Sequence, residues 1–289
     1  MRFRYRGITF GGRDLPVVVT SWEGPTTDLS GETTARLQDD GVTGTPQYLG
    51  AGSWQISIAT NASDLKEALA LAGELETAWK LASVRSSTAP SPLDYSTDEG
   101  VTWRRIYGKP GKFAPPTDTV HAKLGVALAD LEFIQYDPTH YTATERQATI
   151  TGAASIVGGL RSPLRSPLRT IATGGVRGGR LENGGDQPSP CVVTFYGPST
   201  NPTLTTSRGR TIRYVGALAY DQSVVLDAMA HTVRLYPGGA GVPGRLDART
   251  LLSDLSVPAG VSDWAYQAVD VSGTSRAVVA WRDAHTALQ

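Results

Sequence analysis

Hydrophobic and polar residues alternate along most of this chain in short runs, which is the pattern of β-strands. In residues 54–58, Trp-Gln-Ile-Ser-Ile, every second side chain is apolar, so one face of that strand is expected to be buried. The runs are rich in Val, Ile, Thr and aromatic residues, and Asp98-Glu99-Gly100 between two of them predicts a hairpin turn. Strands are predicted over residues 15–22, 52–59, 101–107, 122–136, 148–157, 191–196, 211–215, 223–227, 232–236 and 277–281.

One segment has helical spacing instead of alternation. Asp64 is a suitable N-cap, and Glu67 follows it at the spacing of a capping box. Apolar residues then recur at helical spacing: Leu65, Leu69, Ala72, Leu75, Trp79 and Ala82. We predict one α-helix over about 64–83, packed by its Leu/Trp stripe against a sheet, in a protein that is otherwise mostly β.

Residues 158–185 differ from their surroundings. The sequence Arg-Ser-Pro-Leu occurs twice in succession, and Gly-Gly pairs follow it. Because Pro and Gly at this density disfavour helix and central strand, the stretch is predicted to be an extended arm, linker or long loop. The domain boundary is placed before it, which gives an N-terminal β domain over 1–141 and a C-terminal domain over 142–289.

Length and composition narrow the class of protein. The chain has 289 residues, 40% of them hydrophobic, which is enough for one large or two medium domains with packed cores. Its single cysteine, Cys191, precludes an intrachain disulfide and is expected to be a small buried side chain. No apolar run approaches membrane-spanning length, and the N-terminus lacks an apolar signal-peptide region, so we expect no membrane insertion.

The formal net charge of zero hides an uneven distribution. Residues 1–140 contain 13 Lys and Arg against 17 Asp and Glu, a net −4. Residues 141–289 contain 14 basic against 10 acidic residues, a net +4, and no lysine. Such a chain can dock head-to-tail on copies of itself or steer a charged partner. A GC-rich genome that prefers arginine codons is the other explanation.

Five arginines lie between residues 158 and 185 without an acid before Glu182: Arg161, Arg165, Arg169, Arg177 and Arg180. They could contact DNA, although no aromatic residues interleave with them to stack on bases. A loop that contacts a neighbouring subunit and a plain flexible connection are the other two interpretations. We take Arg161, Arg165 and Arg169 as candidate interface residues, which would pair with the acidic half of another copy.

Motifs for catalysis and metal binding are absent from the sequence. The histidines at 121, 140, 231 and 285 are scattered without metal-ligand spacing, and no nucleophile elbow, phosphate-binding loop or dinucleotide fingerprint occurs. The adjacent acids at 39–40 and 98–99 are typical of solvated turns, and the tryptophans are expected mostly in cores. We predict that the protein is not an enzyme and holds no cofactor or metal.

Three strings occur in order at wide separation: residues 133–141 (FIQYDPTHY), 183–190 (NGGDQPSP) and 192–204 (VVTFYGPSTNPTL). A strand ending in aspartate, 224–227 (VVLD), follows them. Together they resemble the distal tail protein family (Dit) of long-tailed, siphovirus-type bacteriophages, and residues 278–284 are similar to the ends of minor tail proteins. The positions that carry the motifs are Asp137, Pro138, Tyr141, Gly197, Asn201, Pro202 and Asp227.

These positions have structural rather than catalytic chemistry. Pro138 ends a strand because proline donates no backbone hydrogen bond, and Asp137 can cap the turn. Tyr141 can wedge between two domains while its hydroxyl reaches a partner. Gly197 permits a backbone conformation closed to other residues, and Asn201-Pro202 is a turn pair.

The resemblance implies an N-terminal β domain carrying a helix and a C-terminal galectin-like β-sandwich. It also implies a virion protein, made in the host cytoplasm, whose six copies form a ring at the tail tip. Such a ring connects the tail tube protein, the tape-measure protein and the tail-tip hub, and DNA passes through its lumen without specific binding. The N-terminal strands and residues 36–50 are our candidates for contacts between copies.

Two other functions stay open from the sequence. A carbohydrate- or receptor-binding β-sandwich of the virion would hold a host-surface glycan on an exposed aromatic beside polar groups in a groove. A glycan-cleaving enzyme would need two carboxylates roughly 5–9.5 Å apart in a deep groove.

Overall fold

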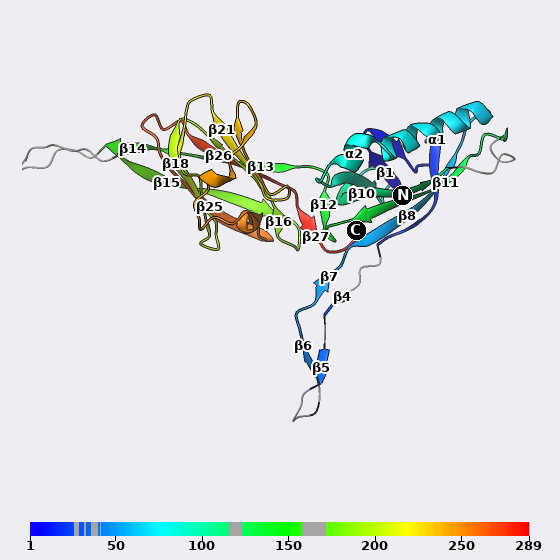
Figure 1. Cartoon of the computed structure of the whole chain (residues 1–289), viewed down its shortest axis with the longest axis horizontal. Coiled ribbons are helices and arrows are strands. Elements are labelled where there is room, and N and C mark those ends of the chain that lie inside the picture. Colours follow the sequence, from blue (N-terminus) through cyan, green and yellow to red (C-terminus); the bar gives the residue numbers. More distant parts are fainter. Residues whose placement is uncertain are drawn as a thin grey trace, which may run out of the picture. The chain divides into compact units, whose positions relative to one another are not determined.

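The computed structural model describes residues 1–25, 29–31, 33–35, 40, 42–115, 123–157 and 172–288. The chain forms two compact units, Met1–Ala143 with Thr286–Gln289 (unit 1) and Thr144–His285 (unit 2). Figure 1 shows that strands dominate both units, which confirms the predicted mostly β fold class.

Unit 1 is built on an antiparallel sheet that curls around a core rich in aromatic side chains. Its strands follow the order β2-β1-β9-β10-β11-β8-β3, and β12 pairs with β10. A bridge between Gly11 and Val18 brings the two ends of this order together. The strands are β1 (Arg2–Tyr5), β2 (Ile8–Phe10), β3 (Val17–Glu23), β8 (Gly52–Thr60), β9 (Ser91–Ser96), β10 (Arg104–Ala114), β11 (Leu128–Gln135) and β12 (His140–Thr142).

Helix α1 (Leu65–Trp79) begins as its sequence predicts. The Asp64 carboxylate accepts a hydrogen bond from the Glu67 backbone N–H at 2.8 Å, and the Ser63 hydroxyl donates to the Glu67 carboxylate at 2.6 Å. The helix ends at Trp79, earlier than predicted. Leu81 adopts an extended conformation, which stops the helix, and a second, short helix, α2 (Ala82–Ser86), follows.

The C-terminal part of the predicted stripe of α1 packs against the sheet, whereas in its first half Leu69 is 45% exposed and Ala68 is buried instead. Leu75 is fully buried and Trp79 is 1% exposed. The Trp79 ring lies 4.9 Å from the Tyr5 ring on β1 and 6.1 Å from the Phe133 ring on β11. One helix therefore closes the core over strands from both halves of the sheet.

Between β3 and β8 the chain leaves the sheet as a β-hairpin (Figure 1). In this hairpin β4 (Leu29–Ser30) pairs with β7 (Tyr48–Leu49), and β5 (Thr33–Ala35) pairs with β6 (Val42–Gly44). Residues 44–49 are exposed. Of the predicted contact segment 36–50, residues 36–39 and 41 lie outside the described residues.

Unit 2 is a β-sandwich of two antiparallel sheets. The first sheet has the order β13-β26-β17-β21-β22-β23, and the second has the order β14-β15-β25-β18-β19, with β20 paired to β18. The first sheet contains β13 (Arg146–Thr151), β17 (Val192–Tyr196), β21 (Ser223–Asp227), β22 (Thr232–Tyr236), β23 (Ala240–Gly241) and β26 (Arg276–Trp281). The second contains β14 (Ala153–Val157), β15 (Ala172–Asn183), β18 (Ser199–Thr205), β19 (Thr211–Arg213), β20 (Ala217–Leu218) and β25 (Gly260–Val269).

The core of unit 2 lies between its two sheets. Phe195 on β17 and Tyr266 on β25 stack with ring centroids 5.9 Å apart, and both are fully buried. Short elements complete the unit: β16 (Ser189–Pro190), β24 (Ser256–Val257), β27 (Ala284–His285) and the 3₁₀ turns η1 (Pro243–Arg245) and η2 (Leu252–Asp254).

The predicted arm over 158–185 is wrong for its C-terminal part. Residues 172–183 form β15, which lies between β14 and β25 inside the sheet. A Cβ at Gly179 would lie 2.4 Å from the Ile150 side chain, so glycine here permits the two sheets to approach. The glycines that suggested a loop are thus a packing requirement. Residues 158–171, with Arg161, Arg165 and Arg169, lie outside the described residues.

Other strands were missed or merged in the sequence analysis. Strands β1, β9, β18 and β25 have no counterpart among the predicted runs. The predicted strand 148–157 is divided at Gly152, where a Cβ would lie 2.4 Å from the Ser275 hydroxyl. Strands β21 and β22 begin and end at the predicted residues, because apolar and polar residues alternate clearly in both and turn residues flank them.

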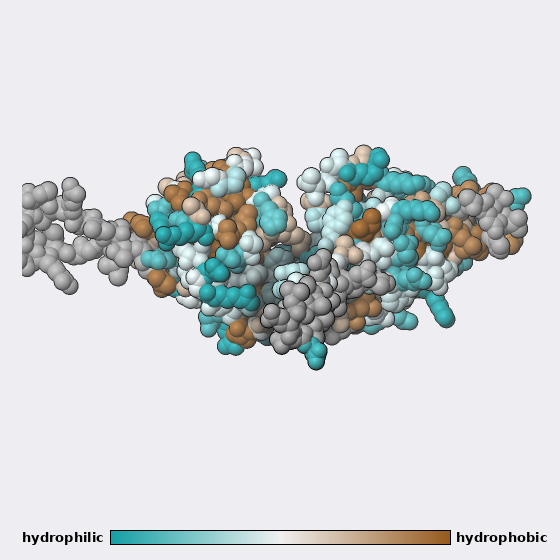
Figure 2. All heavy atoms as spheres, turned by 60° about the horizontal axis from the view of Figure 1, so that its bottom comes forward, coloured by the Kyte–Doolittle hydropathy of each residue, from teal (hydrophilic) through white to brown (hydrophobic). Residues whose placement is uncertain are grey.

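The surfaces of both units mix polar and apolar residues (Figure 2). Four tryptophans are buried as predicted, with exposed fractions of 5% or less, and Trp22 is 37% exposed. No described helix is long and apolar enough to cross a membrane.

Candidate functional site

The Asp137 turn follows β11 and leads into β12. The Asp137 carboxylate accepts one hydrogen bond from the Thr139 backbone N–H at 2.9 Å and another from the Tyr141 hydroxyl at 2.5 Å. The Gln135 side-chain amide donates to the Asp137 carbonyl oxygen at 2.6 Å. Pro138 stands inside this turn, where its missing N–H leaves no donor unsatisfied. The turn is therefore closed by its own side chains.

Tyr141 has its hydrogen-bond partner inside unit 1. Its side chain is buried, and its ring packs edge-on against Tyr107 at 5.4 Å. Burial, together with the negative charge of Asp137, raises the pKa of the Tyr141 hydroxyl. The phenol consequently stays neutral and acts as a hydrogen-bond donor that fixes the turn.

A buried polar cluster beside this turn was missed by the sequence analysis. The Trp54 indole N–H donates to the Gln135 side-chain oxygen at 2.8 Å, and the Tyr95 hydroxyl pairs with His140 Nδ1 at 2.8 Å. Trp54 also packs against Tyr95, with ring centroids 5.2 Å apart. These residues come from β8, β9, β11 and β12, and no spacing in the sequence links them.

Gly197 follows β17 at a point of close backbone approach. A Cβ there would lie only 1.9 Å from the Ala219 carbonyl oxygen, so any side chain would force the two segments apart. Gly197 does not have a left-handed φ angle, unlike several other glycines of unit 2. A left-handed φ is therefore not the reason for glycine here, and lack of space is.

Asn201 and Pro202 lie inside β18 rather than in a turn. The register of β18 against β25 shifts between Thr200 and Thr203, and Asn201 takes a φ of 51° within this irregularity. The Asn201 side-chain oxygen accepts from the Gly216 N–H at 2.9 Å, and the Asn201 N–H donates to the Gly216 carbonyl at 2.8 Å. The asparagine therefore holds the bulge against a neighbouring segment, which corrects the predicted turn pair.

Asp227 ends β21 and caps the turn that leads to β22. Its carboxylate accepts hydrogen bonds from the backbone N–H groups of Met229 and Ala230, each at 2.9 Å. In the register of β17 with β21, Asp227 is opposite Val192, whereas Gly197 follows the other end of β17. The motif residues of unit 2 therefore do not converge on one site.

Asn183 organises the second motif string. It is fully buried, and its amide donates to the Gln187 carbonyl at 2.8 Å and the Val257 carbonyl at 3.2 Å. Its side-chain oxygen accepts from the backbone N–H groups of Gly185 and Ala284, at 3.0 Å and 3.3 Å. One side chain thus joins β15 to three other segments of unit 2.

The described residues contain no group of three or more His, Cys, Asp or Glu side chains arranged to hold a metal ion. Cys191 is buried, and burial raises the pKa of its thiol. A neutral buried thiol is a packing group rather than a nucleophile. The motif residues thus shape turns, strand ends and the bulge in β18.

Comparison with known proteins gives a likeness of structure and none of sequence. No protein-family model matches the chain, and no curated protein matches it. The crystal structure of the Dit protein of phage SPP1, described as a paradigm of the hub adsorption apparatus in phages that infect Gram-positive hosts, matches with a TM-score of 0.57 and 14% identity over 98% of each chain.

Baseplate structures of phage p2 in the activated conformation match in the same way. A chain of the calcium form has a TM-score of 0.56 and 10% identity, over 99% of each chain. A chain of the strontium form has a TM-score of 0.58 and 10% identity, over 97% of this chain and 96% of that one. The likeness includes both units, and it confirms the resemblance noted in the sequence: the chain has the fold of phage distal tail (Dit) and baseplate proteins.

Proposed function

We propose that the chain is a structural, non-enzymatic component of a phage tail tip, which acts by assembling into a ring of six copies. The single observation that carries this proposal is the fold match to Dit and baseplate proteins over nearly the whole of each chain. In the virion the ring would connect the tail tube protein and the tape-measure protein to the tail-tip hub, with DNA passing through the lumen.

The edge of the unit 1 sheet supports contacts between copies. β3 is the last strand in the sheet order and pairs with β8. Its residues Thr20, Ser21, Trp22 and Glu23 are exposed, and the hairpin that follows presents Tyr48 and Leu49. Among the described residues this edge is open beyond the bridge at Val18, and an open edge with apolar side chains beside it is stabilised when a neighbour covers it. A head-to-tail contact of this kind produces a ring when the rotation that relates neighbouring copies returns to the first copy after a full turn.

The mass of the purified full chain, measured by light scattering, tests the proposal together with negative-stain microscopy. We expect hexamers and six-fold rings. A chain that stays monomeric at every concentration and shows no rings would contradict the proposal.

A second experiment replaces Arg161, Arg165 and Arg169 together by serine. We expect weaker assembly at low salt, where charge interactions are least screened, and unchanged melting of each unit. The matched control replaces three exposed arginines of unit 2, Arg213, Arg234 and Arg249, by serine, which removes the same charge. Equal assembly of both triple variants would refute a specific role for the three arginines at an interface.

A further inference from the structure

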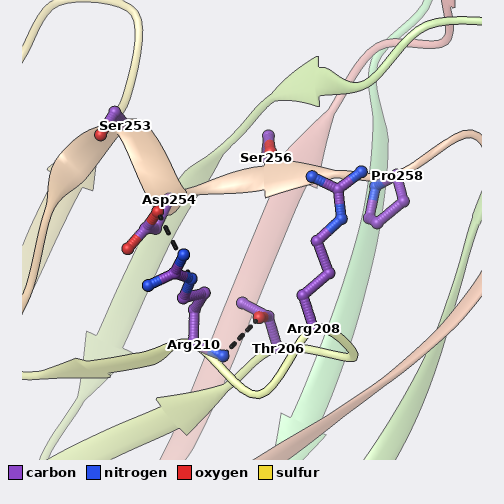
Figure 3. A pocket seen from close by; sticks show the side chains of 7 residues that line it. All are labelled: Thr206, Arg208, Arg210, Ser253, Asp254, Ser256 and Pro258. Atoms are coloured by element: carbon purple, nitrogen blue, oxygen red, sulfur yellow. Dashed lines mark hydrogen bonds and ion pairs between the residues drawn. The ribbon is translucent and has the colours of Figure 1, made fainter.

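A small polar pocket in unit 2 plays no part in the proposed assembly. It has a volume of about 130 Å³ and lies between the turn that joins β18 to β19 and the segment from η2 through β24 (Figure 3). No aromatic side chain lines it. Its lining residues are Thr206, Arg208, Arg210, Ser253, Asp254, Ser256 and Pro258.

The β18–β19 turn places two guanidinium groups side by side. The Thr206 N–H donates to the Arg210 carbonyl at 2.8 Å, and the Gly209 N–H donates to the Thr206 carbonyl at 2.9 Å. Gly209 has a φ of +74°, a conformation that glycine adopts without strain. With Gly209 between them, Arg208 and Arg210 both extend from the turn toward the opposite wall (Figure 3).

The opposite wall is anchored in the core. Leu255 is 1% exposed and Val257 is fully buried, so Ser256 between them points to the other side of the chain. The Leu255 carbonyl accepts from the Cys191 N–H at 3.2 Å, and β24 pairs with β16. Because backbone bonds hold both walls, the pocket keeps its width without a ligand.

The charges of the pocket leave hydrogen-bond donors unused. Arg210 Nε lies 4.0 Å from Asp254 Oδ1, too far for a hydrogen bond, and the Arg210 side chain is 66% exposed. Arg208 is exposed and makes no hydrogen bond or ion pair with any described residue. Two guanidinium groups face one carboxylate, which leaves a net charge of +1 at the pocket.

This donor set suits a compact oxyanion. Each guanidinium presents N–H groups in a planar fork that matches phosphate oxygens, and serine hydroxyls can donate further bonds. We infer that the pocket binds a phosphate group, either as the free ion or as a phosphomonoester. The inference concerns unit 2 alone and holds whether or not copies of the chain form a ring.

Titration calorimetry of the full chain with inorganic phosphate, glucose 6-phosphate and glucose tests the inference. We expect saturable binding of both phosphates and none of glucose. Tighter binding of glucose 6-phosphate would identify a phosphomonoester as the ligand, and equal or weaker binding of it would identify the free ion. Absence of saturable phosphate binding would overturn the inference.

Arginine variants locate the binding. Arg208→Gln and Arg210→Gln are each expected to weaken phosphate binding about tenfold, because each removes a charged hydrogen bond. The control is Arg213→Gln, since Arg213 is an exposed arginine of β19 that does not line the pocket. If the control weakens binding as much as the other two, general surface charge explains the binding and the inference fails.

The Asp254→Asn variant distinguishes a binding role of the pocket from a purely structural role of its residues. It removes the one negative charge that repels phosphate and competes for Arg210, so binding should become several-fold tighter. Weaker binding in this variant, with unchanged thermal unfolding, would contradict the proposed orientation of Arg210 toward the ligand.

Discussion

The two units use buried polar groups in different ways. In unit 1, side chains from separate strands bond to each other inside the core, as in the pairs Trp54–Gln135 and Tyr95–His140. In unit 2, the indole N–H groups of Trp264 and Trp281 are buried without a hydrogen-bond partner among the described residues, as is that of Trp79 in unit 1. There, the polar side chains with motif roles bond to backbone groups at turns and bulges.

This difference has an energetic consequence. A buried bond between two side chains leaves one partner unsatisfied when the other is removed, which adds a desolvation penalty to the loss of packing. A buried indole without a partner contributes packing and already bears the desolvation cost of its N–H group. The paired groups of unit 1 should therefore be more sensitive than unpartnered indoles to changes that preserve shape and remove a polar atom.

The largest expected effect comes from Trp54→Phe. The change leaves a smaller ring and a Gln135 side-chain oxygen without its donor, so the free energy of unfolding should fall by about 3 kcal/mol in total. The matched variant is Trp264→Phe, which removes an indole N–H without a partner and should cost about 1–2 kcal/mol less. Urea denaturation followed by circular dichroism measures both, and equal costs would remove the distinction between paired and unpartnered indoles.

Asn201→Ala tests the side-chain-to-backbone bonds of unit 2. It leaves the Gly216 N–H without its acceptor and places alanine at a φ of 51°, so we expect a loss of about 2 kcal/mol. Asn201→Gly removes the same hydrogen bond without backbone strain and should lose less. Thermal unfolding of the two variants separates the terms, and identical losses would show that strain contributes nothing.

Tyr141→Phe is expected to cost about 1 kcal/mol, because Asp137 keeps its bond from Thr139 and loses one of two donors. The hydroxyl pKa is raised in the folded unit, so its contribution is fully present below pH 10 and is lost as the pH rises further. The variant should accordingly flatten the fall in melting temperature above pH 10. An unchanged alkaline profile would count against this assignment.

The smallest effect concerns the exposed turn at Asp98. Hydrogen bonds from Thr102 and Ser96 lower the pKa of the Asp98 carboxyl to about 2. Its stabilising contribution is therefore present above the ordinary pKa of an aspartate and is lost as the pH falls toward 2. Asp98→Asn should reduce the change in melting temperature between pH 4 and pH 2, and calorimetry at these pH values would detect it.

Several local features of the fold were predictable from the sequence. The N-cap at Asp64 uses residues adjacent in the chain, so the pattern alone identifies it. The strands β8, β21 and β22 alternate clearly and are bounded by turn residues, and their predicted and observed ranges agree within a residue. These elements are determined by local spacing and by local hydrogen bonds.

The candidate site was only partly predictable. The capping role expected of Asp137 is seen, yet the neighbouring bond between Trp54 and Gln135 joins residues 81 positions apart. For Gly197 and Asn201 the residue positions were identified and the reasons were wrong. In both cases the reason for the residue lies on another segment of the chain, since Ala219 crowds the glycine and the Gly216 N–H donates to the asparagine.

By itself the sequence determined the mostly β character, the helix and the order of the motif strings. Only the tertiary structure decided that the glycine-rich residues 172–183 form the interior strand β15, because the lack of a side chain at Gly179 matters only where Ile150 packs on it. It also decided that Arg208 and Arg210 face Asp254 across a pocket. Local spacing encodes burial and turns, whereas such partners are set by strand pairing between distant parts of the chain.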